Sequence, residues 1–562
     1  MNSEQQYSWQ DTLRYGLISG IISLSVCLIG MVETFSERNI VGDQVSLGLI
    51  LLAFPAFAIP YVLVQKSAHS RGLQHIIQGL VIGLLTAFPL VILVFVAEPL
   101  NLRQFLINAS PGLIKFLTFD QEKGQGIIWL FALMGGLGFV GAALFWLPIR
   151  LRRAIVVAVS TVFAMGLLSE VLSLVLGIKG IAGDVKKFLF PSRGLSIEGA
   201  GLIFIIVACL NIVWNWRREP IQRRIDALPA TQQRNLRWIS TILLMLVVLS
   251  VPSIVGTYLT EVLDNVGLFI LMGLGLNIVV GFAGLLDLGY VAFFAIGAYA
   301  IGVLTSETDL AIASLSFWQA LPIAVLVSVA AGVILGVPVL RMRGDYLAIV
   351  TLGFGEIIRV LVLSDFLRPW IGGAQGILSI PKPSIASFEL KGPEQLYYLI
   401  FAGCLIAIFI SSRLRDARLG RQWMAMREDE DVAEAMGINL VKTKLLAFGM
   451  GAAFAGFSGA IFAAKLGSIF PHSFNLLISI NVLSLIIVGG MGSLPGVFVG
   501  ALILVGLPEL LREFAEYRLL MYGILLIAMM IAKPEGFWPS AIHRRELHSG
   551  EREDSGQAPL PA

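Results

Sequence analysis

The histidines, cysteines and acidic residues of this sequence are not spaced as in the common catalytic or metal-binding motifs. Five histidines lie in predicted loops or near the C-terminus, and no H-E-x-x-H zinc motif occurs. The sequence also contains no G-x-x-x-x-G-K-[ST] phosphate-binding loop and no G-x-S-x-G nucleophile turn. Cys27, Cys209 and Cys404 lie inside apolar runs and are interpreted as small buried hydrophobic residues. We therefore expect a protein that is not an enzyme and that needs no metal ion or cofactor.

Other polar residues lie inside long apolar segments, where an unpaired charge is costly. Glu356 and Arg359 are three residues apart on one predicted helix and can form an ion pair. That pair is interpreted as a lock between helices, which we favour, or as part of a binding site. Asp287 is interpreted as a cap of the following span, in preference to a substrate contact. Asn277 and Asn481 lie in spans six apart and are expected to line a cavity or to bond between helices.

The composition indicates a membrane protein. Of the 562 residues, 57% are apolar and only 14% are charged, whereas soluble domains carry about 25% charged residues. So few charged side chains cannot cover a water-facing surface, which excludes a soluble enzyme, a nucleic-acid-binding protein and a disordered chain. The apolar segments predict an all-α, polytopic integral membrane protein with about 16 transmembrane helices of about 20 residues each.

The predicted spans fall into two blocks. Residues 1–216 are expected to form an N-terminal membrane extension of about six helices, and residues 217–238 a basic cytoplasmic linker loop. Residues 239–540 form the second block, and residues 541–562 a disordered cytoplasmic tail. Lysines and arginines concentrate in alternate loops, which predicts that both termini are cytoplasmic. The first-block spans are predicted near Tyr15–Val32, Val45–Val64, Ile76–Val96, Ile127–Leu147, Ile155–Leu176 and Ile197–Trp214; the second-block spans near Ile239–Ile254, Val262–Val280, Tyr290–Thr305, Ala320–Leu340, Tyr346–Leu363, Leu396–Ile410, Thr443–Ala464, Leu477–Val488, Val497–Leu511 and Leu519–Ala532.

A glycine motif occurs twice in the second block. Gly281 and Gly284 follow one span, and Gly489 and Gly492 follow another, each within the pattern V-G-x-x-G-x-L. Glycine-interrupted segments at corresponding places are typical of transporter repeats. The motif therefore predicts an internal repeat that lines a path or packs helices, unless it is a chance match in a chain with 58 glycines.

A long cytoplasmic loop contains a predicted amphipathic helix. Strong helix formers run from Trp423 to Met436, and Gly437 is suited to the left-handed end of a helix. Trp423, Met426, Ala433 and Met436 give this helix an apolar side. We expect the helix either to dock into a groove of a soluble partner or to lie on the membrane surface.

The same loop resembles a known motif. Asp431-Val-Ala433, followed after three residues by Gly437, is similar to the EAA loop of bacterial ABC importer permeases, with Asp in place of Glu and Val in place of the first Ala. Longer segments resemble the Liv-type branched-chain amino-acid ABC permeases, specifically the M-type subunit. These segments are Gly275–Tyr299, Arg343–Arg359, Gly372–Ile377 and Gly489–Gly496, and they occur in the family's order within residues 239–540. The first 238 residues resemble the family less strongly.

This resemblance implies a transport mechanism. The core would be a multi-pass permease of a bacterial inner membrane that moves branched-chain or related amino acids. Its expected partners are a second, H-type permease subunit, two cytoplasmic ATPase subunits that hydrolyse ATP, and a periplasmic substrate-binding protein. The resemblance places ATPase coupling at Trp423, Met426, Asp431, Ala433, Glu434 and Gly437, and docking of the binding protein at Gly372, Gly373 and Gly376, unless these glycines serve only as turns.

Three other functions remain open from the sequence. Permeases for urea and short amides share the same motifs, so such an importer is the alternative within the class. An ion-coupled secondary transporter is disfavoured, because the spans show no clear chain of carboxylates near the membrane centre. The first block, taken alone, is also compatible with a membrane scaffold that transports nothing.

Overall fold

In the computed structural model of the protein, the described residues are 9–66, 73–97, 99–177, 182–191, 194–226, 229–308, 310–340, 342, 344–385 and 388–510, with scattered residues between 517 and 539. Among these, 11 helices are long and apolar enough to cross a membrane, which confirms an all-α, polytopic membrane protein. The count of about 16 spans stays a prediction. Half of the residues of the predicted span Leu519–Ala532 lie outside the described residues, and the predicted tail at 541–562 lies entirely outside them.

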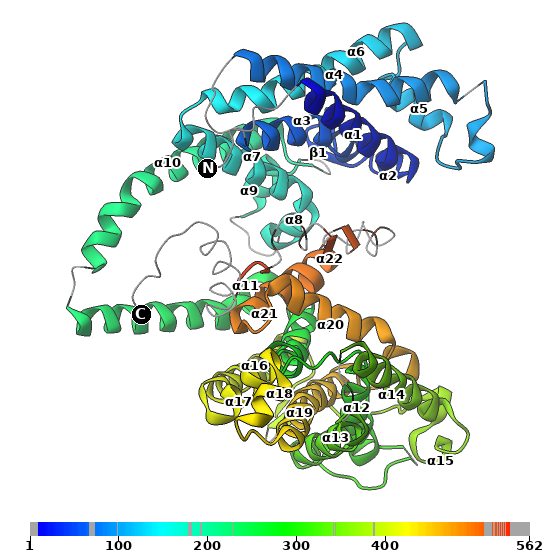
Figure 1. Ribbon diagram of the computed structural model, residues 1–562, viewed down its shortest axis with the longest axis vertical. Helices are drawn as coiled ribbons and strands as arrows, with labels where there is room; N and C mark the ends of the chain where they lie inside the picture. Colours follow the sequence, from blue (N-terminus) through cyan, green and yellow to red (C-terminus); the bar gives the residue numbers. More distant parts are fainter. Residues whose placement is uncertain are drawn as a thin grey trace. The chain divides into compact units, whose positions relative to one another are not determined.

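The chain divides into two compact units, Met1–Ile242 and Leu243–Ala562. In the first unit, α1, α3, α4 and α6 lie side by side (Figure 1). Strands β1 and β2 form an antiparallel pair with Asn39 opposite Ser46. The elements are α1 (Trp9–Leu28), α2 (Met31–Thr34), β1 (Asn39–Val41), β2 (Val45–Ser46), α3 (Leu47–Lys66), α4 (Leu73–Val96), η1 (Leu102–Gln104), α5 (Pro111–Leu117), α6 (Lys123–Ala143), η2 (Leu144–Trp146), α7 (Ile149–Leu167), α8 (Ser169–Gly177), α9 (Ala182–Leu189) and α10 (Ile197–Asp226).

Small residues allow close packing in the first unit. A Cβ atom added at Gly83 of α4 would clash with the carbonyl oxygen of Met134 in α6, so these two helices approach backbone to backbone. The Thr86 hydroxyl donates a hydrogen bond of 2.7 Å to the Ser19 hydroxyl and thereby joins α4 to α1. These contacts hold the helices together without charged groups.

The structure differs from the sequence predictions at two places in this unit. The predicted span Ile155–Leu176 is divided between α7 and α8. The predicted loop at 217–238 is largely helical, because α10 continues to Asp226 and α11 begins at Ala230. Arginine and glutamine are good helix formers, so a basic composition alone does not make this segment a loop.

The second unit contains the glycine motifs and the predicted amphipathic helix. Strands β3 and β4 pair antiparallel, with Ser384 opposite Glu389. The elements are α11 (Ala230–Leu276, which begins in the first unit), the π-helix η3 (Asn277–Phe282), α12 (Val291–Thr305), α13 (Phe317–Val339), α14 (Asp345–Leu363), α15 (Arg368–Ile371), η4 (Gly373–Gln375), β3 (Ser384–Ile385), β4 (Phe388–Glu389), α16 (Pro393–Asp416), α17 (Arg418–Glu428), α18 (Glu430–Ala435), α19 (Leu440–Leu466), η5 (Pro471–Ser473), α20 (Leu476–Gly489), α21 (Leu494–Ala501), the π-helix η6 (Leu502–Gly506) and α22 (Leu507–Leu510).

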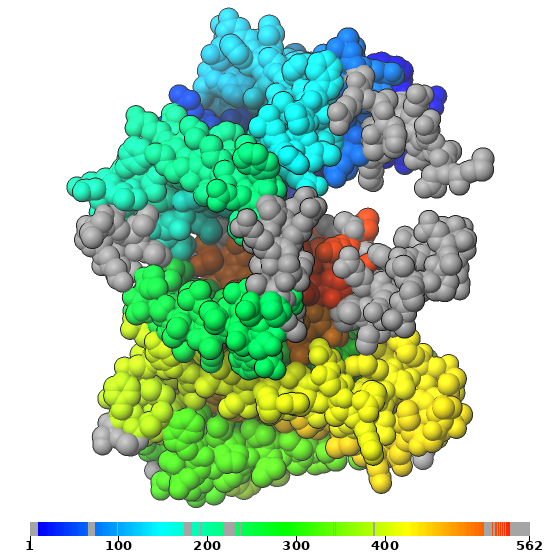
Figure 2. Space-filling view, turned by 90° about the vertical axis from the view of Figure 1, so that its left-hand side faces the viewer, coloured from blue at the N-terminus to red at the C-terminus, as the bar shows by residue number. Residues whose placement is uncertain are grey.

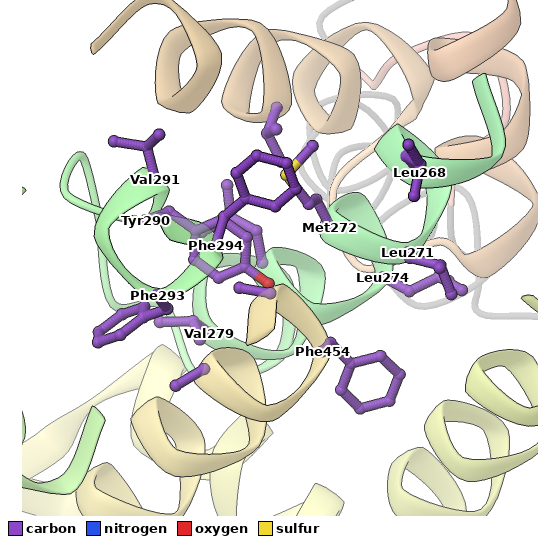
Figure 3. Close-up of a cluster of buried hydrophobic side chains, with 14 of the residues drawn as sticks. Leu268, Leu271, Met272, Leu274, Val279, Tyr290, Val291, Phe293, Phe294 and Phe454 are labelled. Carbon is purple, nitrogen blue, oxygen red and sulfur yellow. The ribbon is translucent and has the colours of Figure 1, made fainter. Parts of the chain in front are cut away.

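Helix α19 packs against α12 and α13 at the centre of this unit. Figure 3 shows part of the core, with Met272 of α11, Phe294 of α12 and Phe454 of α19 among its buried side chains. The buried Tyr290 hydroxyl donates a hydrogen bond of 2.9 Å to the Gly451 carbonyl oxygen of α19. A Cβ atom at Gly459 would clash with the carbonyl oxygen of Phe294, so α12 and α19 touch through their backbones.

The predicted break between two spans is present inside α11. The sequence places this break between Ile254 and Val262, and the structure has a kink there at Gly256 (φ 79°, ψ 175°) that separates two helical stretches. The side-chain-free glycine tolerates this positive φ. Glu261, which the predicted spans leave between Ile254 and Val262, lies on the helical stretch that follows this kink.

Candidate functional site

The amphipathic segment, residues 418–439, contains two helices, so the single helix predicted from Trp423 to Met436 is wrong. Asp429 has an extended backbone (φ −157°, ψ 116°) that separates α17 from α18. Its carboxylate accepts hydrogen bonds from the amides of Asp431 and Val432 at 2.9 and 3.0 Å. This capping at the start of α18 competes with a continuous helix.

The apolar side of the amphipathic segment faces its own unit. The fully buried Trp423 indole donates a hydrogen bond of 2.9 Å to the Thr443 carbonyl oxygen, which attaches α17 to the start of α19. Met426 and Ala433 are also buried. These three predicted coupling residues therefore anchor the segment and are not exposed to a partner.

Met436, predicted on the apolar side together with these three residues, lies instead on the outward surface of α18. Val432 is 59% exposed and Met436 is 79% exposed, which leaves two apolar side chains four positions apart in contact with solvent. The predicted residues Asp431 and Glu434 are exposed beside them. In Figure 2 much of the yellow surface, which includes α17, lies on the face shown.

Both ends of α18 have fixed geometry. Gly437 has a φ of +87°, which confirms that it ends the helix in the left-handed conformation. The Gly437 and Ile438 amides donate to the Glu434 and Ala433 carbonyl oxygens at 2.9 and 3.0 Å. With Asp429 at one end and Gly437 at the other, α18 is a short capped rod.

Arg427 connects the amphipathic segment to the first glycine motif. Its guanidinium Nη1 donates a hydrogen bond of 2.7 Å to the carbonyl oxygen of Gly281, at the end of π-helix η3. A Cβ atom on Gly284 (φ +72°) would lie 2.8 Å from Arg427 Cγ, so the chain needs glycine there. A π-helix is a local irregularity that often marks a functional site. Nothing in the sequence distinguishes Arg427 from the other residues of its charged run.

The two glycine motifs meet in space. The Gly492 amide donates a hydrogen bond of 2.8 Å to the buried side-chain oxygen of Asn277. A Cβ atom at Gly281 would lie 2.7 Å from the Gly492 nitrogen. A Cβ atom at Gly489 would clash with the Gly496 carbonyl oxygen, so the second motif is also a close backbone turn. Asn277 thus bonds between segments, one of the two roles predicted for it.

A buried ion pair holds α18 to α19. Lys444 Nζ lies 2.9 Å from Glu430 Oε2, and the Lys444 side chain is only 2% exposed. A buried ammonium without a carboxylate is strongly disfavoured. The pair therefore restrains the angle of α18, and it was not predicted from the sequence.

Replacing Glu430 with alanine is expected to lower stability by about 1–3 kcal/mol, because Lys444 would remain buried without this partner. The loss should concentrate in the amphipathic segment and appear as faster hydrogen exchange and tryptic cleavage there. Glu434→Ala, at an exposed position of the same helix, is the matched control. Equal exchange in both variants would contradict a structural role for the pair.

The remaining predicted residues are placed as follows. Glu356 and Arg359 form the predicted ion pair on α14, with Oε2 and Nε 2.7 Å apart. The buried Asp287 carboxylate accepts a hydrogen bond of 2.9 Å from the Gly289 amide, so it caps the turn before α12 and not the helix itself. Asn481 is half-buried on α20. No cluster of metal-ligating side chains is found among the described residues.

The predicted docking loop follows α15. Gly372, Gly373 and Gly376 all have positive φ, between +55° and +77°, which explains the glycines as turn residues. Gly372 and Gly376 also line an open cleft together with Thr308, Leu310, Arg368, Pro369 and Gln375. The loop is fixed to the rest of the unit by backbone pairing between Ile377 and Ile469.

A second ionic cluster lies at the C-terminal end of α19, and sequence reasoning missed it. The buried Lys465 Nζ is 2.9 Å from Glu261 Oε1 and donates a hydrogen bond of 2.7 Å to Asn265. The Lys382 ammonium donates to the Lys465 carbonyl oxygen. Burial lowers the pKa of Lys382, which is held near a second lysine. The available signal was the position of Lys465 directly after the predicted span Thr443–Ala464.

Comparison with known proteins identifies the family. Residues 258–532 match the family described as branched-chain amino acid transport system / permease component. The chain is 41% identical over 402 residues to the LivM permease protein of Escherichia coli K12, a match covering 64% of this chain and 93% of that protein. It is 37% identical over 403 residues to LivM of Salmonella typhimurium, with the same coverage. The chain belongs to this family of permeases.

More distant relatives agree with this assignment. A probable LivM protein of Methanocaldococcus jannaschii is 24% identical over 317 residues, covering 49% of this chain and 91% of that protein. The matches to the two bacterial LivM proteins cover more of the chain than residues 258–532, so the similarity extends beyond the part that defines the family. No solved structure matches the chain. The chain is a transport permease component and not an enzyme.

Proposed function

We propose that the chain imports branched-chain amino acids across a bacterial inner membrane as the M-type permease subunit of an ATP-binding-cassette importer. The bacterial LivM proteins are named for high-affinity branched-chain amino acid transport. In the proposed complex, an H-type permease is the second membrane subunit, two cytoplasmic ATPase subunits hydrolyse ATP, and a periplasmic binding protein delivers the substrate. Both termini of the chain are proposed to be cytoplasmic. A urea or short-amide importer is not favoured.

The observation that best supports an ATP-driven mechanism is the hydrogen bond between Arg427 and Gly281. Val432 and Met436, with Asp431 and Glu434 beside them, form a surface that fits an apolar groove with a basic rim on an ATPase. A push on capped α18 would pass through α17 and Arg427 to π-helix η3. A rigid rod can transmit such a movement, whereas a flexible loop cannot.

The other predicted sites have proposed roles in the same transporter. Residues 1–216 are a membrane extension, 217–238 a basic linker region and 239–540 the permease core. The loop with Gly372, Gly373 and Gly376, and the cleft beside it, are proposed to receive the binding protein, with Arg368 as a contact for an acidic side chain. Around the translocation path we place Asn277, Gly281, Gly284, Asp287, Glu356, Arg359, Asn481, Gly489 and Gly492.

Uptake of labelled leucine by cells that contain the complete transporter tests this function. Uptake should persist when a protonophore collapses the proton gradient while ATP is maintained, because ATP hydrolysis would be the energy source. Loss of uptake under these conditions would indicate an ion-coupled transporter. Uptake of urea or acetamide without leucine uptake would assign the chain to the other substrate class.

A further inference from the structure

A narrow cavity lies between α12, α14 and the segment that leads into α20. It holds about 240 Å³ of empty space, its open mouth included. Most of its walls are apolar, formed by Val291, Ala292, Ala295, Ile358, Val362 and Phe474. Small-molecule sites typically combine such apolar walls with a few polar groups that fix the orientation of the ligand.

Arg359 gives this cavity a cation next to an anion. Its side chain is 41% exposed, and its Nε lies 2.7 Å from Oε2 of Glu356, which is 39% exposed. Within the described part of the chain, Glu356 is its one ion-pair partner, so the two Nη groups of Arg359 are available as donors. A half-exposed pair can exchange partners with a ligand at lower cost than a fully buried pair.

Tyr299 lines the same cavity and carries a buried hydroxyl. The residue is 6% exposed and lines the cavity from α12. Its hydroxyl is buried and has no hydrogen-bond partner among the described residues. Its ring lies 5.6 Å from that of Phe474, which fixes its position. A buried hydroxyl without a partner is unfavourable unless a ligand or water fills the site.

We propose that this cavity is a transient binding site for the transported α-amino acid. The substrate carboxylate binds the Nη groups of Arg359, the ammonium binds Glu356, and the apolar side chain lies against the wall of α12. The Tyr299 hydroxyl provides a further hydrogen bond. This assignment rests on the proposed function and adds to it a site that recognises a zwitterion with an apolar side chain.

The cavity is wide enough for water but too narrow for a whole amino acid. Binding of the amino acid therefore requires α12 and α14 to move apart. Helix α12 begins at Val291, soon after Gly281, where the Arg427 hydrogen bond ends. Between them, the Leu288 amide donates a hydrogen bond of 3.0 Å to the Thr351 hydroxyl of α14. Movement of η3 would therefore change the spacing of the two helices that line the site.

Photolabelling with a diazirine analogue of leucine tests the site directly. Membranes with the complete transporter are irradiated with the analogue, and the labelled peptides are identified by mass spectrometry. We expect label on the peptides of α12 and α14 that carry Val291–Tyr299 and Ile358–Val362, competed by leucine but not by leucinamide, which lacks the carboxylate. Arg359→Gln should lower the labelling about tenfold, since a hydrogen bond to a charged group is worth about 1.5–3 kcal/mol.

Two further variants separate binding from folding. Tyr299→Phe keeps the ring against Phe474 and should lower labelling about threefold, whereas Arg359→Lys should restore part of it. Tyr398→Phe removes a hydroxyl that donates to the Leu249 carbonyl oxygen outside the cavity, and it should change nothing. If leucine uptake is normal but the label lies on other peptides, or if Arg359→Gln leaves the labelling unchanged, the proposed binding site is wrong. The proposed function would not be affected by either result. A wild-type transporter that takes up no leucine would overturn the proposed function and the site with it.

Discussion

Arg427→Gln is expected to lower leucine uptake about tenfold while ATP hydrolysis continues, because it removes a charge-assisted hydrogen bond worth about 1.5–3 kcal/mol. That bond, 2.7 Å long, joins α17 to the carbonyl oxygen of Gly281. Without it, movement of α18 would no longer be transmitted to η3. The measurement is the ratio of leucine uptake to ATP hydrolysis in proteoliposomes, and this ratio should fall.

Arg421→Gln is the matched control for this experiment. Arg421 also lies on α17, is exposed, and donates a hydrogen bond of 2.9 Å to the neighbouring Asp416 carbonyl oxygen. Its loss leaves the link to η3 intact, so the transport ratio should stay normal. If Arg427→Gln and Arg421→Gln behaved alike, the link to Gly281 would have no role in coupling.

Gly459→Ala is expected to destabilise the protein by about 3 kcal/mol, at the upper end of the usual cost of overpacking. The added methyl group would meet the backbone carbonyl oxygen of Phe294, which cannot turn away as a side chain can. Helices α12 and α19 would have to separate, at the expense of the surrounding core. The measurement is the thermal unfolding midpoint of the purified protein in mild detergent.

Gly449→Ala, on the same helix, provides the comparison. A Cβ atom at Gly449 would lie 3.6 Å from a methyl group of Val333, an ordinary van der Waals contact. Alanine also favours the helix over glycine by about 1 kcal/mol. We expect an unchanged or higher midpoint for this variant. Equal losses in both variants would show that helix composition, and not the contact with Phe294, sets the stability.

Several features could be predicted because they depend on neighbours in the sequence. The i, i+3 spacing of Glu356 and Arg359 predicts their ion pair, since one helical turn brings such residues together. Gly437 could be recognised as a helix end, because left-handed backbone favours glycine. The family resemblance was likewise visible in short motifs, and the comparisons confirm it.

Other features depend on residues far apart in the chain and could not be predicted. The apolar side of the amphipathic segment, including Trp423, packs on α19 of the same chain, although its pattern would equally suit a partner's groove. The Asn277–Gly492 hydrogen bond joins residues separated by 215 positions. A periodic pattern shows that a face will be buried but does not identify what covers it.

The sequence by itself determined that this chain crosses a membrane as helices, because continuous apolar segments of about 20 residues satisfy their backbone groups in lipid within a single helix. Only the tertiary structure decided which polar groups meet. Arg427 reaches the Gly281 carbonyl oxygen, Lys444 reaches Glu430, and Tyr299 shares a cavity with Arg359. These contacts depend on how the helices pack. Helix packing is in turn set by residues that are distant from one another in the chain.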